Sequence, residues 1–83
     1  MQPVLVHDLV GRLVVTQGGA KLGTLKDIAI DGDSGRIVHL EVKPQGLLGG
    51  PHLLIAAEEL IEIQEAMIVV KDTSISVASP VLA

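Results

Sequence analysis

Apolar and polar residues alternate with a period of two along much of this chain, which is the spacing of β-strands that bury one face. The clearest alternation lies between Arg36 and Lys43. Three apolar residues of this stretch share one face: Val38, Leu40 and Val42. The opposite, polar face carries His39, Glu41, Lys43 and one apolar residue, Ile37. The pattern predicts a strand with an apolar inner face that ends at Pro44, because proline lacks the N–H of a sheet ladder.

Similar short runs, separated by Gly, Asp and Pro, predict five further strands. We place the six strands at 12–16, 21–31, 36–43, 52–56, 61–63 and 67–71. Residues 57–60 combine good helix formers with no turn former, and they predict one short helical turn. Six short strands with regular turn signals indicate an all-β fold: a small antiparallel β-barrel, closed or partly open.

The two ends of the chain are less regular. Residues 4–10 predict either an entry strand or a short helical turn that packs Leu5, Leu9 and Val10 against the core. Residues 74–77 predict one more strand, at a sheet edge or across a dimer.

The predicted strand at 21–31 breaks its own alternation, because Leu25 has the opposite parity to Ile28. A β-bulge near Lys26 and Asp27 would return Leu25 to the inner face. Asp27 would then lie within an apolar strand. We favour a structural role for its carboxylate, accepting backbone N–H groups at the bulge, over contact with a ligand or partner.

Three more residues are predicted to have structural roles. Gly23 marks a close backbone approach or a kink. Asp31 and Gly35 bound a turn that suits a type I conformation closed by a left-handed residue. The spacing of the aspartates is similar to the start of a calcium loop, but the twelfth position holds Val42 in place of the required glutamate. We therefore interpret these residues as turn formers.

Composition favours a single small domain with a modest core. The chain has 83 residues, of which 48% are hydrophobic, with no Phe, Trp or Tyr. We expect one domain over residues 1–83, with its core at about 5–71 and a tail at 72–83. A core of small branched side chains barely offsets the entropy of ordering the backbone, so self-association as a homodimer is a natural supplement.

Charge and cysteine content narrow the possible partners. The formal net charge is −4, without a basic run or an aromatic ring, which argues against direct nucleic-acid binding. No cysteine is present, which excludes disulfides and thiolate chemistry and fits a cytoplasmic location. No apolar run approaches the roughly 20 residues of a membrane span, and the start of the chain does not have the pattern of a signal peptide.

No pattern in the chain indicates catalysis. The spacings predict no catalytic residues, no metal site and no cofactor, so we expect a protein that is not an enzyme. One alternative is a small-ligand or metal-binding barrel that uses His39, His52, Asp27 and nearby carboxylates. His7, His39 and His52 share no ligand spacing, which favours three unrelated surface histidines over a metal site.

The leading hypothesis is a protein-interaction module, an adaptor with an unknown partner. Two features are candidate partner contacts. The first is the glycine-rich loop with Leu47 and Leu48 at its tip, and the second is an acidic patch that includes Glu58, Glu59 and Glu62.

The order of these motifs resembles the PRC-barrel family. The resemblance rests on Leu22-Gly23-x-Leu25-x-Asp27-Ile28-x-Ile30-Asp31 followed by Ser34-Gly35-Arg36-Ile37-x-x-Leu40-x-Val42. It continues in Gly46-Leu47-Leu48-Gly49, Leu54-Ile55 and Met67-Ile68-Val69-Val70, and it covers roughly residues 5–71.

The resemblance implies a small β-barrel that contacts other proteins. Family members include stand-alone small proteins, often archaeal, and domains of larger chains. The C-terminal domain of the bacterial ribosome maturation factor helps to engage a ribosomal protein, and the H subunit of the photosynthetic reaction centre carries another such domain at a membrane surface. Both roles imply protein contacts, and the family supplies no catalytic residues to transfer.

Overall fold

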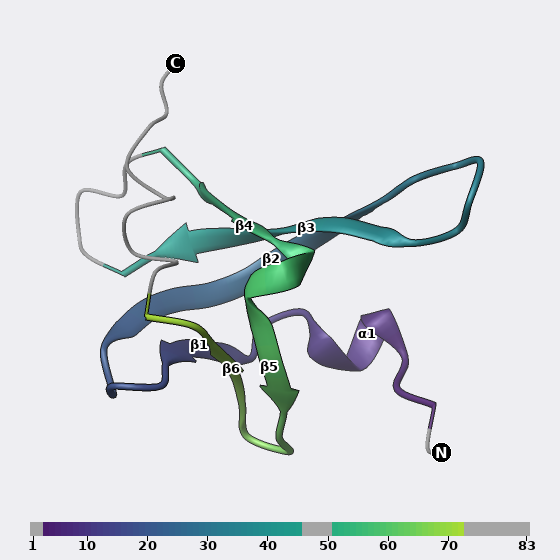
Figure 1. Cartoon of the computed structure of the whole chain (residues 1–83). Coiled ribbons are helices and arrows are strands. Elements are labelled where there is room, and N and C mark those ends of the chain that lie inside the picture. The colour runs from purple at the N-terminus through teal and green to yellow at the C-terminus, as the bar shows by residue number, and fades with distance from the viewer. Residues whose placement is uncertain (1–2, 46–50, 73–83) are drawn as a thin grey trace.

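The computed structural model describes residues 3–45 and 51–72 (Figure 1). One helical turn, α1 (Val6–Leu9), precedes β1 (Leu13–Thr16) and the long hairpin formed by β2 (Lys21–Ile30) and β3 (Ile37–Pro44). The chain continues through β4 (Leu53–Ala56), the 3-10 turn η1 (Ala57–Glu59), β5 (Leu60–Ile63) and β6 (Met67–Val70). Each of the six predicted strands is confirmed to within one residue at either end. The predicted strand at 74–77 lies outside the described residues.

The six strands form one sheet in the order β4-β3-β2-β1-β6-β5. β1 pairs with β6 in parallel, whereas every other pair is antiparallel. The prediction of a wholly antiparallel barrel is therefore wrong at this one pair. A parallel neighbour requires a long crossover, and here β2, β3, β4 and β5 intervene between β1 and β6.

The barrel is partly open. Within the described residues β4 and β5 are the two edge strands and form no ladder with each other. They follow one another in sequence, separated only by η1. Because three residues span little distance, the sheet must curl until its two edges come close, as Figure 1 shows. The partly open form of the prediction is confirmed and the closed form is wrong.

The core lies inside this curl. Its buried members are aliphatic residues from α1 and five strands: Leu9, Val14, Leu25, Leu40, Val42, Ile55, Ile68 and Val70. Burial of such side chains contributes roughly 1.5–3 kcal/mol each. The prediction for the N-terminal segment is confirmed for Leu9 and wrong for Leu5 and Val10, which are 65% and 48% exposed. A single helical turn presents too little surface to bury more than one of them.

α1 is the only α-helix among residues 3–45 and 51–72. It spans four residues. In that part of the chain no helix is long and apolar enough to cross a membrane.

Two bulges shape the β2–β3 hairpin. The register shifts between Leu25 and Asp27, so the predicted bulge at Lys26–Asp27 is confirmed and Leu25 is buried at 1% exposure. A second shift pairs Ala29 with His39 but Ile30 with Ile37. It leaves Val38 without a partner on β2.

The outer part of this hairpin extends past its neighbours, and we call residues 26–38 the hairpin arm (Figure 1). β1 pairs with β2 only as far as Thr24, and β4 pairs with β3 only over His39–Val42. Within the described residues, β3 is therefore the only strand beside β2 from Lys26 onward, and Ile37 and Val38 of β3 have no β4 residue beside them. Val38, predicted to face the core, is 48% exposed because it lies beyond the part of β3 that pairs with β4 and supplies Leu40 and Val42 to the core.

Candidate functional site

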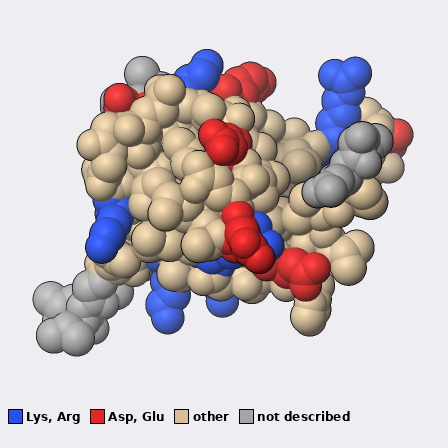
Figure 2. Space-filling model, turned by 90° about the horizontal axis from the view of Figure 1, so that it is seen from below, with Lys and Arg blue, Asp and Glu red and all other residues tan. Residues whose placement is uncertain are grey.

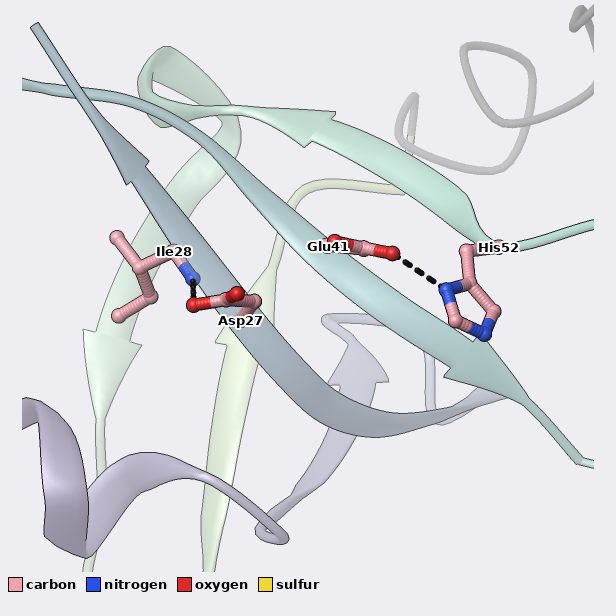
Figure 3. A network of polar contacts seen from close by, with 4 residues as sticks. All are labelled: Asp27, Ile28, Glu41 and His52. Carbon is pink, nitrogen blue, oxygen red and sulfur yellow. Dashed lines mark hydrogen bonds and ion pairs between the residues drawn. The ribbon is translucent and has the colours of Figure 1, made fainter.

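A polar group lies on the outer face of β2 and β3, on the side opposite the core (Figure 3). Asp27 of β2 and Glu41 of β3 are directly opposite each other in the ladder. His52, which precedes β4, directs its Nδ1 to the Glu41 Oε2. The side chains of His52 and Glu41 are 32% and 33% exposed, so the pair is half-buried. The contact holds the start of β4 against β3.

Asp27 has the predicted structural role. Its Oδ1 accepts the backbone N–H of Ile28 at 2.8 Å (Figure 3). The sequence pattern predicted that the Asp27 carboxylate lies among apolar side chains. This part of the prediction is wrong, because Asp27 is exposed. The bulge turns its side chain to the outer face, where water solvates it and where it faces Glu41. Two carboxylates placed directly opposite across a ladder repel each other, and the hydrogen bonds that each makes elsewhere offset that repulsion.

The histidines do not gather into a metal site. His39 lies on β3 between Ala29 and Ala56, its partners on the adjacent strands. His7 lies on α1, where its Nδ1 is 3.6 Å from Asp8. Over residues 3–45 and 51–72 no three His, Asp or Glu side chains are arranged to hold a metal ion. The metal-binding alternative therefore has no support from this part of the chain.

Asp31 organises the tip of the hairpin arm. Its Oδ1 accepts the backbone N–H of Asp33 at 3.0 Å, and its Oδ2 accepts the Ser34 hydroxyl at 3.0 Å. The first of these bonds, followed by the second, lowers the pKa of the Asp31 carboxyl below its ordinary value of 3.8. Gly35 adopts a φ of 76°, and its N–H donates to the Asp31 carbonyl at 2.8 Å. The predicted turn is confirmed at Asp31 and Gly35. The Asp31 carboxylate oxygens, which suggested a calcium loop, accept hydrogen bonds within the turn.

Gly23 occupies a close backbone approach, as predicted. A Cβ built on it would lie 2.0 Å from the Lys43 carbonyl oxygen, and its φ is 151°. No L side chain fits this position, because the neighbouring strand β3 leaves no room.

The acidic residues predicted to contact a partner lie at the β5 edge of the sheet. Glu58 and Glu59 belong to η1 and Glu62 to β5; Glu58 and Glu62 are exposed and Glu59 is half-buried. Gln64 Nε2 donates to Glu62 Oε2 at 3.1 Å, while Arg12 Nη1 donates to the Gln64 carbonyl at 2.6 Å. A partner role for these carboxylates stays a prediction. Leu47 and Leu48, the other predicted contacts, lie outside the described residues.

Charge is dispersed over the face seen in Figure 2. Acidic and basic side chains both occur there, in places next to each other, among broad areas that carry neither. Such a face has no single-sign field that would steer a strongly charged partner.

Two features were not anticipated from the sequence. The first is the Glu41–His52 pair, which a register assignment would have shown, because both residues fall on the polar side of adjacent strands. The second is the apolar surface of the hairpin arm, where Ile30, Ile37 and Val38 are 51%, 40% and 48% exposed. The sequence feature that could have indicated this apolar surface is Ile37, an apolar residue on a strand face otherwise occupied by polar residues.

Comparison with known proteins agrees with this fold. The family model of the PRC-barrel domain matches residues 1–76. A solved structure similar to this chain is the crystal structure of a protein assigned as the 16S ribosomal RNA processing protein RimM of Pseudomonas aeruginosa, with a TM-score of 0.62 and 23% sequence identity. The match covers 82% of this chain and 43% of that chain, so our chain spans less than half of that protein. Comparison with curated proteins gives no match. With most of its length matched by the family model, the chain belongs to the PRC-barrel domain family.

Proposed function

We propose that this chain is a non-enzymatic protein-interaction module that works as a homodimer. The observation that carries the proposal is the apolar surface of the hairpin arm, where Ile30, Ile37 and Val38 lie on paired strands and are 40% exposed or more. Exposed aliphatic residues on a preformed surface are typical of protein contact sites. An arm already held by its own ladder loses little conformational entropy when a partner covers it.

The polar residues support the non-enzymatic part of this proposal. His52 is bound to Glu41, Asp27 to the Ile28 N–H, and Asp31 to the turn that it closes. These groups hold backbone and neighbouring strands in place. Acid–base catalysis needs such groups positioned toward a substrate.

The likeness to the RNA-processing protein supports the fold of the module, and the proposal does not extend to that protein's activity. At 23% identity over 43% of that chain, no partner is carried over. We propose a protein partner and no direct contact with nucleic acid, because the net charge is −4 and the chain has no aromatic residue for base stacking.

The experiment is size-exclusion chromatography with light scattering and refractive-index detection, since a chain without Trp or Tyr absorbs little near 280 nm. A dimer gives twice the chain mass of 8.7 kDa. A monomer at millimolar concentration contradicts the dimer. A stoichiometric metal found by elemental analysis of the protein from native extract contradicts the interaction module and favours the metal-binding alternative.

A further inference from the structure

Strand β5 has one edge that pairs with no strand of the described residues. It is the last strand of the sheet, and only β6 forms a ladder with it (Figure 1). The Gln64 N–H donates to the Met67 carbonyl at 2.8 Å, so these opposed residues form a hydrogen-bonded pair. Because such pairs alternate along an antiparallel ladder, the next pair, Ile63 with Ile68, is not hydrogen-bonded. The N–H and C=O of Ile63 therefore point away from β6, toward the free edge.

The other end of β5 has a free carbonyl. The Val70 carbonyl accepts the N–H of Gln17 at 2.9 Å, so the backbone groups of Val70 face β1 and not β5. Leu60, the residue opposite Val70, accordingly directs its own backbone groups to the free edge. The Leu60 N–H donates to the Ala57 carbonyl within η1. The C=O of Leu60 and both backbone groups of Ile63 thus have no partner within residues 3–45 and 51–72.

Apolar and acidic side chains lie on opposite faces of this edge. Directly opposed residues of an antiparallel pair share a face. Ile63 is opposite the buried Ile68 and so belongs to the inner face, yet it is 37% exposed. Glu62 is opposite Val69 on the outer face, and its side chain is exposed. A strand added along β5 would therefore meet an isoleucine on one face and a carboxylate on the other.

The charge beside this edge is negative and unpaired. Glu58 precedes β5 and Glu65 follows it, and both are exposed. All 6 Lys and Arg residues of the chain lie within residues 3–45 and 51–72, and none forms an ion pair with Glu58, Glu62 or Glu65. Pairing of this edge with the same edge of a second copy would bring these carboxylates together, and like charges that meet across strands are destabilising. The charge therefore favours a cationic occupant over a second copy.

We propose that the β5 edge binds an extended segment of another protein in which aliphatic and basic residues alternate. The segment adds an antiparallel strand that forms hydrogen bonds with the free backbone groups of Leu60 and Ile63. Its aliphatic side chains cover Ile63 on the inner face, and its Lys or Arg side chains meet Glu62 on the outer face. The inference rests on the proposed interaction function and names a class of partner. It does not depend on the homodimer, whose supporting surface is the hairpin arm.

The length of β5 sets the expected affinity. Its 4 residues span about 13 Å of strand, so an added strand buries much less than the ~800 Å² per partner of a standard interface. We expect a dissociation constant on the order of 100 μM. The charge contacts are exposed and screened by salt, so binding should weaken further at about 0.5 M salt.

The probe is a short capped peptide in which valine and lysine alternate, carrying a fluorophore, and the measurement is its fluorescence anisotropy with the full chain. Two peptides of equal charge are its controls. One has the same composition with all lysines grouped at one end, and the other is N-methylated at every valine. The valines share the face of Ile63 and lie opposite it, so N-methylation blocks their hydrogen bonds to β5. We expect both controls to bind at least about tenfold more weakly.

The first variant is Ile63→Pro, with Ile63→Thr as its control. Proline removes the N–H that faces the free edge, while the ladder with β6 does not use that N–H. We expect Ile63→Pro to weaken peptide binding at least about tenfold. Threonine keeps the N–H and the branched shape, so we expect Ile63→Thr to weaken binding about threefold or less. Far-UV circular dichroism verifies that both variants fold.

The second variant is Glu62→Lys, with Asp33→Lys as its control. Both residues are exposed, and the two substitutions change the net charge by the same amount. Asp33 lies at the tip of the hairpin arm, away from β5. We expect Glu62→Lys to weaken peptide binding about fivefold or more and Asp33→Lys to leave it unchanged.

The outcomes separate this inference from the homodimer. Equal binding of the alternating and the N-methylated peptides, or of Ile63→Pro and Ile63→Thr, overturns strand addition at β5. Binding of Glu62→Lys as tight as that of the wild type overturns the basic class of partner. A chain that is monomeric by light scattering and binds the peptide as expected supports this inference and contradicts the homodimer. A dimer that does not bind the peptide does the reverse.

Discussion

Strand β2 runs through two different environments. In one its side chains stabilise the fold, and in the other they are exposed and available to a partner. Leu25, near its middle, is 1% exposed, and Ile30, at its end, is 51% exposed. The two side chains are similar in chemistry and lie five residues apart on one strand. Leu25 belongs to the same buried cluster as Leu9 of α1 and the core residues of the other strands. The hairpin arm extends beyond the rest of the sheet (Figure 1). Burial here depends on what lies opposite a side chain, not on its hydrophobicity.

The largest expected effect is at the covered end of the sheet. Gly23→Ala would place a Cβ 2.0 Å from the Lys43 carbonyl oxygen at a backbone φ of 151°. We expect a loss of at least about 3 kcal/mol in the free energy of unfolding, because β2 and β3 must separate to admit the methyl group. Urea denaturation followed by far-UV circular dichroism measures it.

Two glycines near the tip of the arm are matched controls for that substitution. Gly35 has a φ of 76° with no atom within 4 Å of a built Cβ, so Gly35→Ala should cost about 1–2 kcal/mol from backbone strain alone. Gly32 has neither strain nor neighbours, and Gly32→Ala should change stability by less than about 0.5 kcal/mol. Equal costs at all three positions would show that the close approach at Gly23 is not what holds the hairpin.

The second prediction compares the two side chains of β2 directly. Leu25→Ala should lower the free energy of unfolding by about 3 kcal/mol, because it leaves a cavity among Val42, Ile55 and other core residues. Ile30→Ala should cost less than about 1 kcal/mol, since half of that side chain already contacts water. Both values are measured by urea denaturation at one low protein concentration. Similar costs at the two positions would mean that the arm is packed and the contrast is wrong.

Most of this architecture could be predicted from the sequence because local patterns determine it. The parity break at Leu25 located the first bulge, and Asp31 with Gly35 located the turn at the arm's tip. The second bulge, at Val38, could not be found in the same way. Val38 keeps perfect alternation with Leu40 and Val42, and only its position beyond the core reveals that this alternation buries nothing.

Long-range pairings had no local signal. The parallel contact of β1 with β6 joins residues more than fifty positions apart, such as Leu13 and Met67. Alternation says which face of a strand is buried, but it does not say which strand lies beside it. The Glu41–His52 pair has the same origin, because it depends on the register of β4 against β3.

A smaller effect is expected on the outer face, where the Glu41–His52 pair joins β3 to β4. Both side chains are about a third exposed, so their coupling should be about 0.5 kcal/mol and should weaken at 1 M salt. A double-mutant cycle with Glu41→Gln and His52→Asn isolates this coupling from the repulsion between Glu41 and Asp27. A parallel cycle on His7 and Asp8, whose side chains are 95% and 57% exposed, should give no coupling. A coupling above about 2 kcal/mol would mean that this pair stabilises the fold as strongly as a core contact, in contrast to an ordinary surface pair.

The smallest expected effect is a pH dependence at the tip of the arm. The pKa of Asp31 is lowered in the folded chain, so near pH 3.8 the unfolded chain binds more protons at this residue and folding is favoured as pH rises. The resulting stability is present above the unfolded pKa and is lost as pH falls through the folded one. We expect the wild type to exceed Asp31→Asn in thermal stability at pH 6 and the difference to shrink as the solution is acidified below 3.8.

Asp33→Asn is the control, because the Asp33 carboxylate accepts no hydrogen bond within residues 3–45 and 51–72. A difference between wild type and Asp31→Asn that stays constant with pH would mean that the turn needs the shape of residue 31 and not its charge.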